Sequence, residues 1–191
     1  MQQPRRSVSR LPPLPDSSDP SLRELFDDTR RRGGHVLNLH LTLGHAPKLA
    51  LARRATANAI RYDAVTPRLL RELAIVRTAQ IVGSDYELNQ HVPMALAAGL
   101  TRAQLDGVQD WRGNALFDDR QRALLAYVEQ VAGGGDVDDA TFDGFARFFT
   151  PQEIVEITIT VASYYGTGLV TKALRIEVET DGRHAAPGPP K

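Results

Sequence analysis

Helix start and stop signals recur along most of this chain, and they constrain its fold more than any other feature. Capping residues precede apolar-periodic segments at Thr66-Pro67, at Thr101–Gln104 and at Thr150–Glu153. Gly83 and Gly99 each follow such a segment, where glycine favours the end of a helix. The chain therefore reads as a series of helices with short connections.

The apolar spacing agrees with these signals. We expect helices over residues 21–32, 35–43, 47–62, 66–83, 86–98, 118–133, 138–149 and 150–174, and a helix start at 101. Ile157, Ile159 and Val161 alternate as in a strand, but they lie inside the capped segment that begins at Thr150. The sequence predicts an all-α fold, a single-domain bundle of about seven or eight helices.

Proline marks both ends of this predicted domain. Residues 1–20 contain five prolines among serines and arginines, and residues 181–191 contain three. We interpret 1–20 as a proline-rich arm, 21–180 as the helical domain and 181–191 as a flexible tail. The arm has two possible readings, a disordered tail or a segment that wraps a neighbouring subunit.

Composition excludes several classes of protein. The chain of 191 residues has 23 basic and 23 acidic side chains, so no basic excess points to nucleic acid. No run of 18 apolar residues is present, and no apolar core follows the N-terminal arginines, so we expect no membrane span and a cytoplasmic protein. The absence of cysteine removes thiol chemistry and disulfides.

Glu87 and His91 are the first candidates for chemistry, because they are four residues apart and share one helix face. A carboxylate beside an imidazole is a proton-transfer pair. Glu72 lies on the preceding predicted helix. Each has a plain structural alternative: Glu72 as a surface partner of Arg71 or Arg68, and the Glu–His pair as an exposed contact that contributes about 0.3 kcal/mol.

The start of the helix that carries this pair is unusually polar. Ser84 and Tyr86 stand there beside the acidic residues, and the following turns, Val92–Leu96, are apolar. A helix N-terminus is a partial positive charge that can hold an anion. We therefore expect a small-molecule pocket at this point of the chain.

The spacing Glu72-x11-Ser84-x2-Glu87-x3-His91 is similar to the glutamate, cysteine, cysteine and histidine pattern of alkylhydroperoxidase D. Arg71–Arg77, Tyr86–Pro93 and Ala97–Leu100 resemble the carboxymuconolactone decarboxylase family, which shares that fold. The resemblance extends over about residues 35–175. It implies an all-α subunit, a homotrimer or a multiple of one, and a pocket around the two motif helices.

Ser84 and Glu87 stand where the redox members have their cysteines, and neither can form a thiolate or a disulfide. The resemblance therefore implies the decarboxylase branch without a cofactor, and not a thiol peroxidase. In this interpretation His91 shuttles the proton, Glu87 orients His91 or shares its proton, and Glu72 holds the site. Ser84 and backbone amides would bind a substrate carboxylate or a developing enolate.

Two further groups are candidates for the pocket. Trp111 could form a lid, and Tyr165 or its neighbour Tyr164 could reach the site as a proton donor, although packing is the plainer role for each. His35, His40 and His45 are spaced by five residues, which is poor helical geometry for a shared metal, so we predict no metal site from them.

The sequence thus predicts a cofactor-independent lyase of the carboxymuconolactone decarboxylase type. Its substrate would be a small organic acid, lactone or enolisable carbonyl compound, decarboxylated or isomerised by proton transfer. Two alternatives remain open. One is a catalytically silent oligomer that binds a small molecule, and the other is a metal-dependent lyase or hydratase that uses Glu72, Glu87 and His91.

Overall fold

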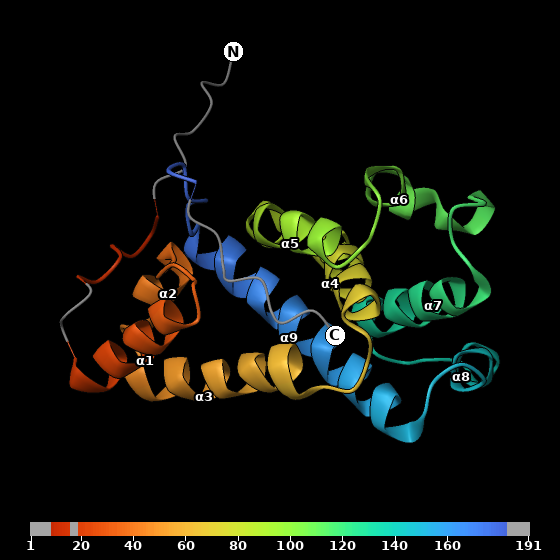
Figure 1. The fold of residues 1–191 in the computed structure, drawn as a ribbon, viewed down its shortest axis with the longest axis horizontal. Coiled ribbons are helices and arrows are strands. Elements are labelled where there is room, and N and C mark those ends of the chain that lie inside the picture. The colour runs from red at the N-terminus through yellow and green to blue at the C-terminus, as the bar shows by residue number, and fades with distance from the viewer. Residues whose placement is uncertain (1–8, 16–18, 183–191) are drawn as a thin grey trace, which may run out of the picture.

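The computed structural model describes residues 9–15 and 19–182, and in that part of the chain every regular element is helical (Figure 1). The nine α-helices are α1 (Pro20–Arg31), α2 (Asn38–Leu43), α3 (Pro47–Asn58), α4 (Arg68–Val82), α5 (Asp85–Ala97), α6 (Arg102–Gly107), α7 (Asp119–Gly133), α8 (Asp139–Ala146) and α9 (Pro151–Leu174). The predicted all-α fold is confirmed, with slightly more helices than expected.

Capping residues set several of these boundaries as predicted. The Thr101 and Thr150 hydroxyls accept hydrogen bonds from backbone N–H groups three residues ahead, at the starts of α6 and α9. Ser84 caps α5 in the same way, since its hydroxyl accepts the Glu87 N–H at 3.3 Å. Each cap satisfies a backbone donor that the first turn would otherwise leave unpaired.

Three helix starts differ from the prediction. Asp19 caps α1 by accepting the Ser21 N–H at 2.8 Å, so the helix begins before the expected capping box. α2 begins at Asn38 rather than at residue 35. Thr66 does not cap α4, because its hydroxyl donates to Glu156 of α9 at 2.7 Å and leaves the N-cap position to Pro67.

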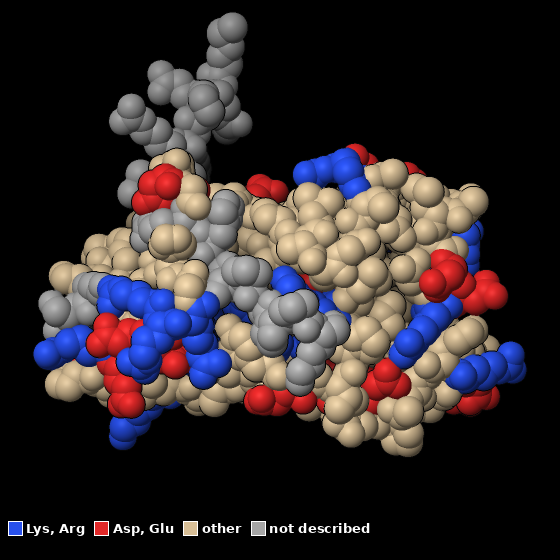
Figure 2. Space-filling model, viewed as in Figure 1, with Lys and Arg blue, Asp and Glu red and all other residues tan. Residues whose placement is uncertain are grey.

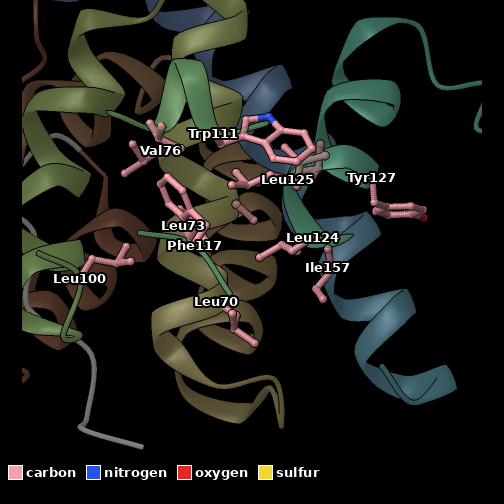
Figure 3. Close-up of a cluster of buried hydrophobic side chains, with 14 of the residues drawn as sticks. Leu70, Leu73, Val76, Leu100, Trp111, Phe117, Leu124, Leu125, Tyr127 and Ile157 are labelled. Atoms are coloured by element: carbon pink, nitrogen blue, oxygen red, sulfur yellow. The ribbon is translucent and has the colours of Figure 1, made fainter. Parts of the chain in front are cut away.

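α4 is the central helix of the bundle, and α5, α7 and α9 all pack against it. Figure 3 shows the main core, in which Leu70, Leu73 and Val76 of α4 meet leucines of α7 and Ile157 of α9. α4 is buried on more than this apolar face, since Arg68, Arg71 and Glu72 are buried too. Buried charged groups need partners, so the polar face of α4 is a natural place for a site.

A π-helical turn, Ala59–Asp63, continues α3 and widens the end of that helix. The Ile60 carbonyl in this turn accepts a hydrogen bond from the Arg71 guanidinium of α4. Arg61, from the same turn, donates to Met94 Sδ of α5 at 3.5 Å. The turn therefore fastens α3 to both helices of the predicted motif, and π-helical turns are frequent at functional sites.

Two backbone hydrogen bonds attach the described part of the predicted arm to the helical domain. The Arg10 N–H donates to the Leu174 carbonyl at 2.9 Å, and the Leu14 N–H donates to the Leu41 carbonyl at 3.3 Å. Residues 1–8 and 16–18 of the arm, and residues 183–191 of the predicted tail, lie outside the described residues.

A buried carboxylate, Glu179, fastens the segment that follows α9. It accepts hydrogen bonds from the Tyr86 hydroxyl at 2.8 Å, from Gln90 Nε2 at 2.8 Å and from the Asn38 N–H at 2.7 Å. Glu179 therefore links the segment that follows α9 to α2 and to α5.

On the face drawn in Figure 2, basic and acidic side chains are interspersed, and no single basic area extends across it. Within residues 9–15 and 19–182, no helix combines the length and the apolar character that a membrane span requires.

Candidate active site

His91 lies between two carboxylates, one at each nitrogen of its ring. Nδ1 is 2.9 Å from Glu72 Oε2, and Nε2 is 3.7 Å from Glu87 Oε2. The three side chains are 6%, 7% and 4% exposed, in the order His91, Glu72, Glu87. Three ionisable side chains are thus close together and buried, unlike an exposed surface pair, and such clusters are candidates for functional sites.

The connection between α4 and α5 produces this geometry. Gly83 ends α4 with a left-handed backbone, φ 67°, which favours glycine, and Ser84 starts α5 immediately. The two helices consequently pack against each other. Glu87 and His91 share one face of α5, and Glu72 reaches the same ring from α4.

The hydrogen bond to Glu72 defines the tautomer of a neutral His91. Because the carboxylate at Nδ1 can only accept, the ring proton lies on Nδ1, and Nε2 presents its lone pair toward Glu87. Burial raises the pKa of Glu87, and the nearby His91, Arg53 and Arg61 oppose this shift without cancelling it. Glu87 therefore retains a proton at a higher pH than an ordinary glutamate, beside an imidazole nitrogen that can take it.

Tyr164 of α9 supports the other side of the imidazole. Its ring packs edge-on against His91, with ring centroids 4.8 Å apart and an interplanar angle of 85°. Burial raises the pKa of the Tyr164 phenol, so the hydroxyl stays protonated at neutral pH. Tyr164 thus fixes the ring by packing and remains a neutral hydrogen-bond donor.

A cavity of about 50 Å³ opens beside Glu87, His91 and Tyr164. Three arginines line it, Arg53 and Arg54 from α3 and Arg61 from the π-helical turn, whereas Glu87 is the one acidic residue among its described lining. Arg54 Nε is buried and makes no hydrogen bond to the described residues. This excess of positive charge suits an anion, and a carboxylate is a good partner for guanidinium groups.

His40 of α2 completes the cavity as a neutral donor. Its Nδ1 accepts the Leu37 N–H at 3.2 Å, so the proton of the neutral ring lies on Nε2. Burial and, to a lesser extent, repulsion from Arg54 and Arg53 together lower the pKa of His40 to about 3. His40 therefore adds no charge at neutral pH, in contrast to the three arginines.

Glu72 is enclosed on the other side by the arginines of its own helix. Arg68 Nε lies 4.0 Å from Glu72 Oε1, and Arg71 is buried beside them. Burial lowers the pKa of Arg71, an effect that Glu72 opposes by attraction. Glu72 does not line the cavity itself, so it acts on the site through His91.

Of the seven site residues predicted from sequence, the structure brings Glu72, Glu87 and His91 into contact. Tyr86 also lines the cavity, where its hydroxyl is held by Glu179. Ser84 does not line this cavity, and its hydroxyl is hydrogen-bonded to the hydroxyl of Thr171 at 3.0 Å. Trp111 and Tyr165 lie against the main core instead; the Trp111 indole donates to Glu129 at 2.9 Å.

The residues that sequence reasoning missed are the arginines of α3, Arg61 and His40. Arg53, Arg54 and Arg61 carry no motif, although three arginines within nine positions of one helical segment, with no acidic residue between them, were a usable signal. In the sequence, His40 stands out only through its spacing from His35 and His45, which bears on metal binding and not on this cavity. Tyr164, rather than Tyr165, is the tyrosine at the imidazole.

The geometry does not favour a shared metal ion. Glu72 and Glu87 approach opposite nitrogens of His91, so one ion cannot bind both carboxylates and the imidazole without rearrangement. In the described portion of the chain, no group of three or more His, Asp or Glu side chains is placed to hold a metal.

Comparison with known proteins supports the same fold. The debrominase Bmp8, solved as a cysteine-to-alanine variant with 2,3,4-tribromopyrrole, is 21% identical; the match covers 91% of this chain and 95% of that one, with a TM-score of 0.75. A peroxidase-related protein from Ralstonia eutropha, described as an alkylhydroperoxidase AhpD core, is 21% identical over 91% of this chain and 94% of its own, with a TM-score of 0.76.

A peroxidase-related protein from a Silicibacter species is 19% identical; the match covers 96% of this chain and 98% of that one, with a TM-score of 0.76. No protein with curated annotation matches the sequence significantly. Residues 47–130 match the profile of the carboxymuconolactone decarboxylase family, and this segment contains Glu72, Glu87 and His91. This segment of the chain is therefore similar to the carboxymuconolactone decarboxylase family, and the chain as a whole has the alkylhydroperoxidase D-like all-α fold without any cysteine.

Proposed function

We propose that this protein is a cofactor-independent acid–base enzyme that acts on a small organic acid, lactone or enolisable carbonyl compound. The observation that carries the proposal is the imidazole of His91 between two buried carboxylates, at the wall of a cavity lined by arginines. The reaction class is decarboxylation or isomerisation by proton transfer, as in a lyase of the carboxymuconolactone decarboxylase type.

The roles of the residues follow from their positions. Glu72 holds the His91 ring through Nδ1 and stabilises the imidazolium when Nε2 takes a proton. Glu87, with its raised pKa, exchanges that proton with Nε2 or delivers it to the substrate. Arg53 and Arg54 bind the substrate carboxylate and offset the negative charge of an enolate.

The first experiment is a thermal-shift screen of small carboxylates and lactones, followed by proton NMR of each bound compound in D₂O. An acid–base enzyme should exchange the acidic C–H of its substrate for deuterium, because His91 Nε2 equilibrates with solvent between removal and return of the proton. Binding without exchange or turnover would instead indicate the silent binding protein, and activity that a chelator abolishes would indicate the metal-dependent lyase.

We predict no thiol-dependent peroxidase activity. The chain has no cysteine to form a sulfenic acid or a disulfide, and the Ser84 hydroxyl is engaged with Thr171. Peroxide consumption should be measured with metal-free protein and a dithiol donor. Turnover clearly above the uncatalysed rate would show that the reaction does not depend on cysteine.

We predict a homo-oligomer, a trimer or a multiple of one. Besides the family resemblance, α9 presents an apolar row to solvent, in which Val155, Ile159 and Leu169 are 57%, 47% and 50% exposed. Light scattering at micromolar concentration should give a mass well above the 21.0 kDa chain. Ile159→Glu should lower that mass, because burying a charge in an apolar interface is unfavourable.

Leu49→Glu is the matched control, since Leu49 is 73% exposed on α3 and not on the apolar row of α9. It should leave the mass unchanged. A single species of chain mass in the wild-type protein would refute the prediction.

A further inference from the structure

A second cavity, of about 320 Å³, lies between α3 and α9. Its lining is largely carbon, with Ala57 and Ile60 on one side and Gly166 and Val170 on the other. The volume is within the range of cavities that bind small organic molecules, about 300–1,000 Å³, and such cavities are usually apolar. Nothing in the proposed acid–base chemistry uses this space.

The cavity beside His91 is too small for a whole substrate of this kind. At about 50 Å³ it accommodates a carboxyl group or a few water molecules. A compound with a carboxylate, a reacting carbon and any further skeleton must therefore extend beyond it. The chemistry of the space next to this cavity then determines what that skeleton can be.

The two cavities share Arg53, Ala57 and Tyr164 as lining residues. The ring centroids of Tyr164 and His91 are 4.8 Å apart. The Tyr164 ring therefore lies between the apolar cavity and the proposed proton shuttle. Arg53 donates to Thr167 of α9 at 3.0 Å, and this bond holds a guanidinium that borders both cavities. A charged group that borders both cavities, with a largely apolar lining in one of them, is the combination that an amphipathic ligand requires.

We propose that the substrate is an amphipathic carboxylic acid, whose acidic end binds beside His91 and Arg53 and whose apolar chain fills the cavity between α3 and α9. This proposal rests on the proposed function and adds the substrate class. The arginines select the acid, and the length of the apolar chain is limited by the cavity. A short, wholly polar acid would leave the cavity unfilled and bind more weakly.

Gly166 allows a direct test. It lies in α9 on the wall of the apolar cavity, and a Cβ added there meets no atom within 4 Å. Gly166→Leu should therefore fill the cavity while the helix is retained, since leucine is a better helix former than glycine. Gly144→Leu on α8 is the matched control, because it also adds leucine at a helical glycine with an open Cβ position, outside both cavities.

Binding of straight-chain monocarboxylates from acetate to octanoate should be measured by calorimetry. In the wild-type protein and in Gly144→Leu, affinity should rise with each added methylene, by up to about fourfold per group. In Gly166→Leu this dependence should be lost, while the affinity for acetate stays as in the wild-type protein.

Three results would overturn the proposal: no binding of any acid in the series, affinity independent of chain length in the wild-type protein, or the same dependence in Gly166→Leu. The series measures binding and not turnover. It therefore stays informative if His91 proves not to transfer protons, and the failure of one proposal can be told from the failure of the other.

Discussion

His91→Ala is expected to lower turnover by about 10²–10⁴-fold, the contribution that a positioned general acid–base group typically makes. The structure gives the reason, because His91 contacts both buried carboxylates and also lines the cavity. Turnover should be measured on the substrate that the exchange screen identifies. A variant that keeps more than about a tenth of wild-type activity would refute the assignment of His91.

The control for this variant is a measurement of folding. His91 is buried and hydrogen-bonded to Glu72, so its removal should cost about 1–3 kcal/mol. This is more than the few tenths expected for an exposed pair on one helix face. Circular dichroism and urea unfolding of His91→Ala should show a folded protein.

The double variant that combines His91→Ala with Glu87→Gln should have a turnover only slightly below that of the less active single variant, because the effects of residues that act as one unit are not additive.

Glu72→Leu is expected to lower the free energy of unfolding by about 3–5 kcal/mol, the cost of removing one partner from a buried charged group. The substitution removes a carboxylate that lies 2.9 Å from His91 Nδ1 and 4.0 Å from Arg68 Nε. The side chains of His91 and Arg68 are both buried. Urea unfolding at neutral pH measures the change directly.

Glu72→Gln is the matched control for this prediction. The amide oxygen can still accept the hydrogen bond from Nδ1, so Glu72→Gln should destabilise less than Glu72→Leu. It should still impair turnover, since the charge that stabilises an imidazolium is gone. A loss of stability below about 1 kcal/mol in Glu72→Leu would mean that water or another group replaces the carboxylate, and that Glu72 is not the partner of a buried charge.

Local signals were sufficient to predict the helices and one edge of the site. Ser84 caps α5, and Glu87 and His91 then share a helix face because they are four residues apart. Glu72 could be predicted from the family resemblance. Local sequence could not show that it meets Nδ1, since that contact depends on how α4 packs against α5.

The remainder of the site comes from helices distant in sequence. Arg53 and Arg54 enter from α3 and His40 from α2, and no spacing rule links these residues to position 91. The two tyrosines show the same limit on one helix. Tyr164 packs on His91, whereas its neighbour Tyr165 turns to the main core, and only the rotation of α9 in the bundle decides between them.

The buried Glu179 has a consequence for protein engineering. Its bonds to Tyr86 and Gln90 hold the helix that carries Glu87 and His91, so the segment after α9 is part of the support of the site. A chimera that took this segment from a protein of the same fold would need compatible side chains at positions 86 and 90. Affinity tags should consequently be added after the last residue of the chain. They should not replace the segment that contains Glu179.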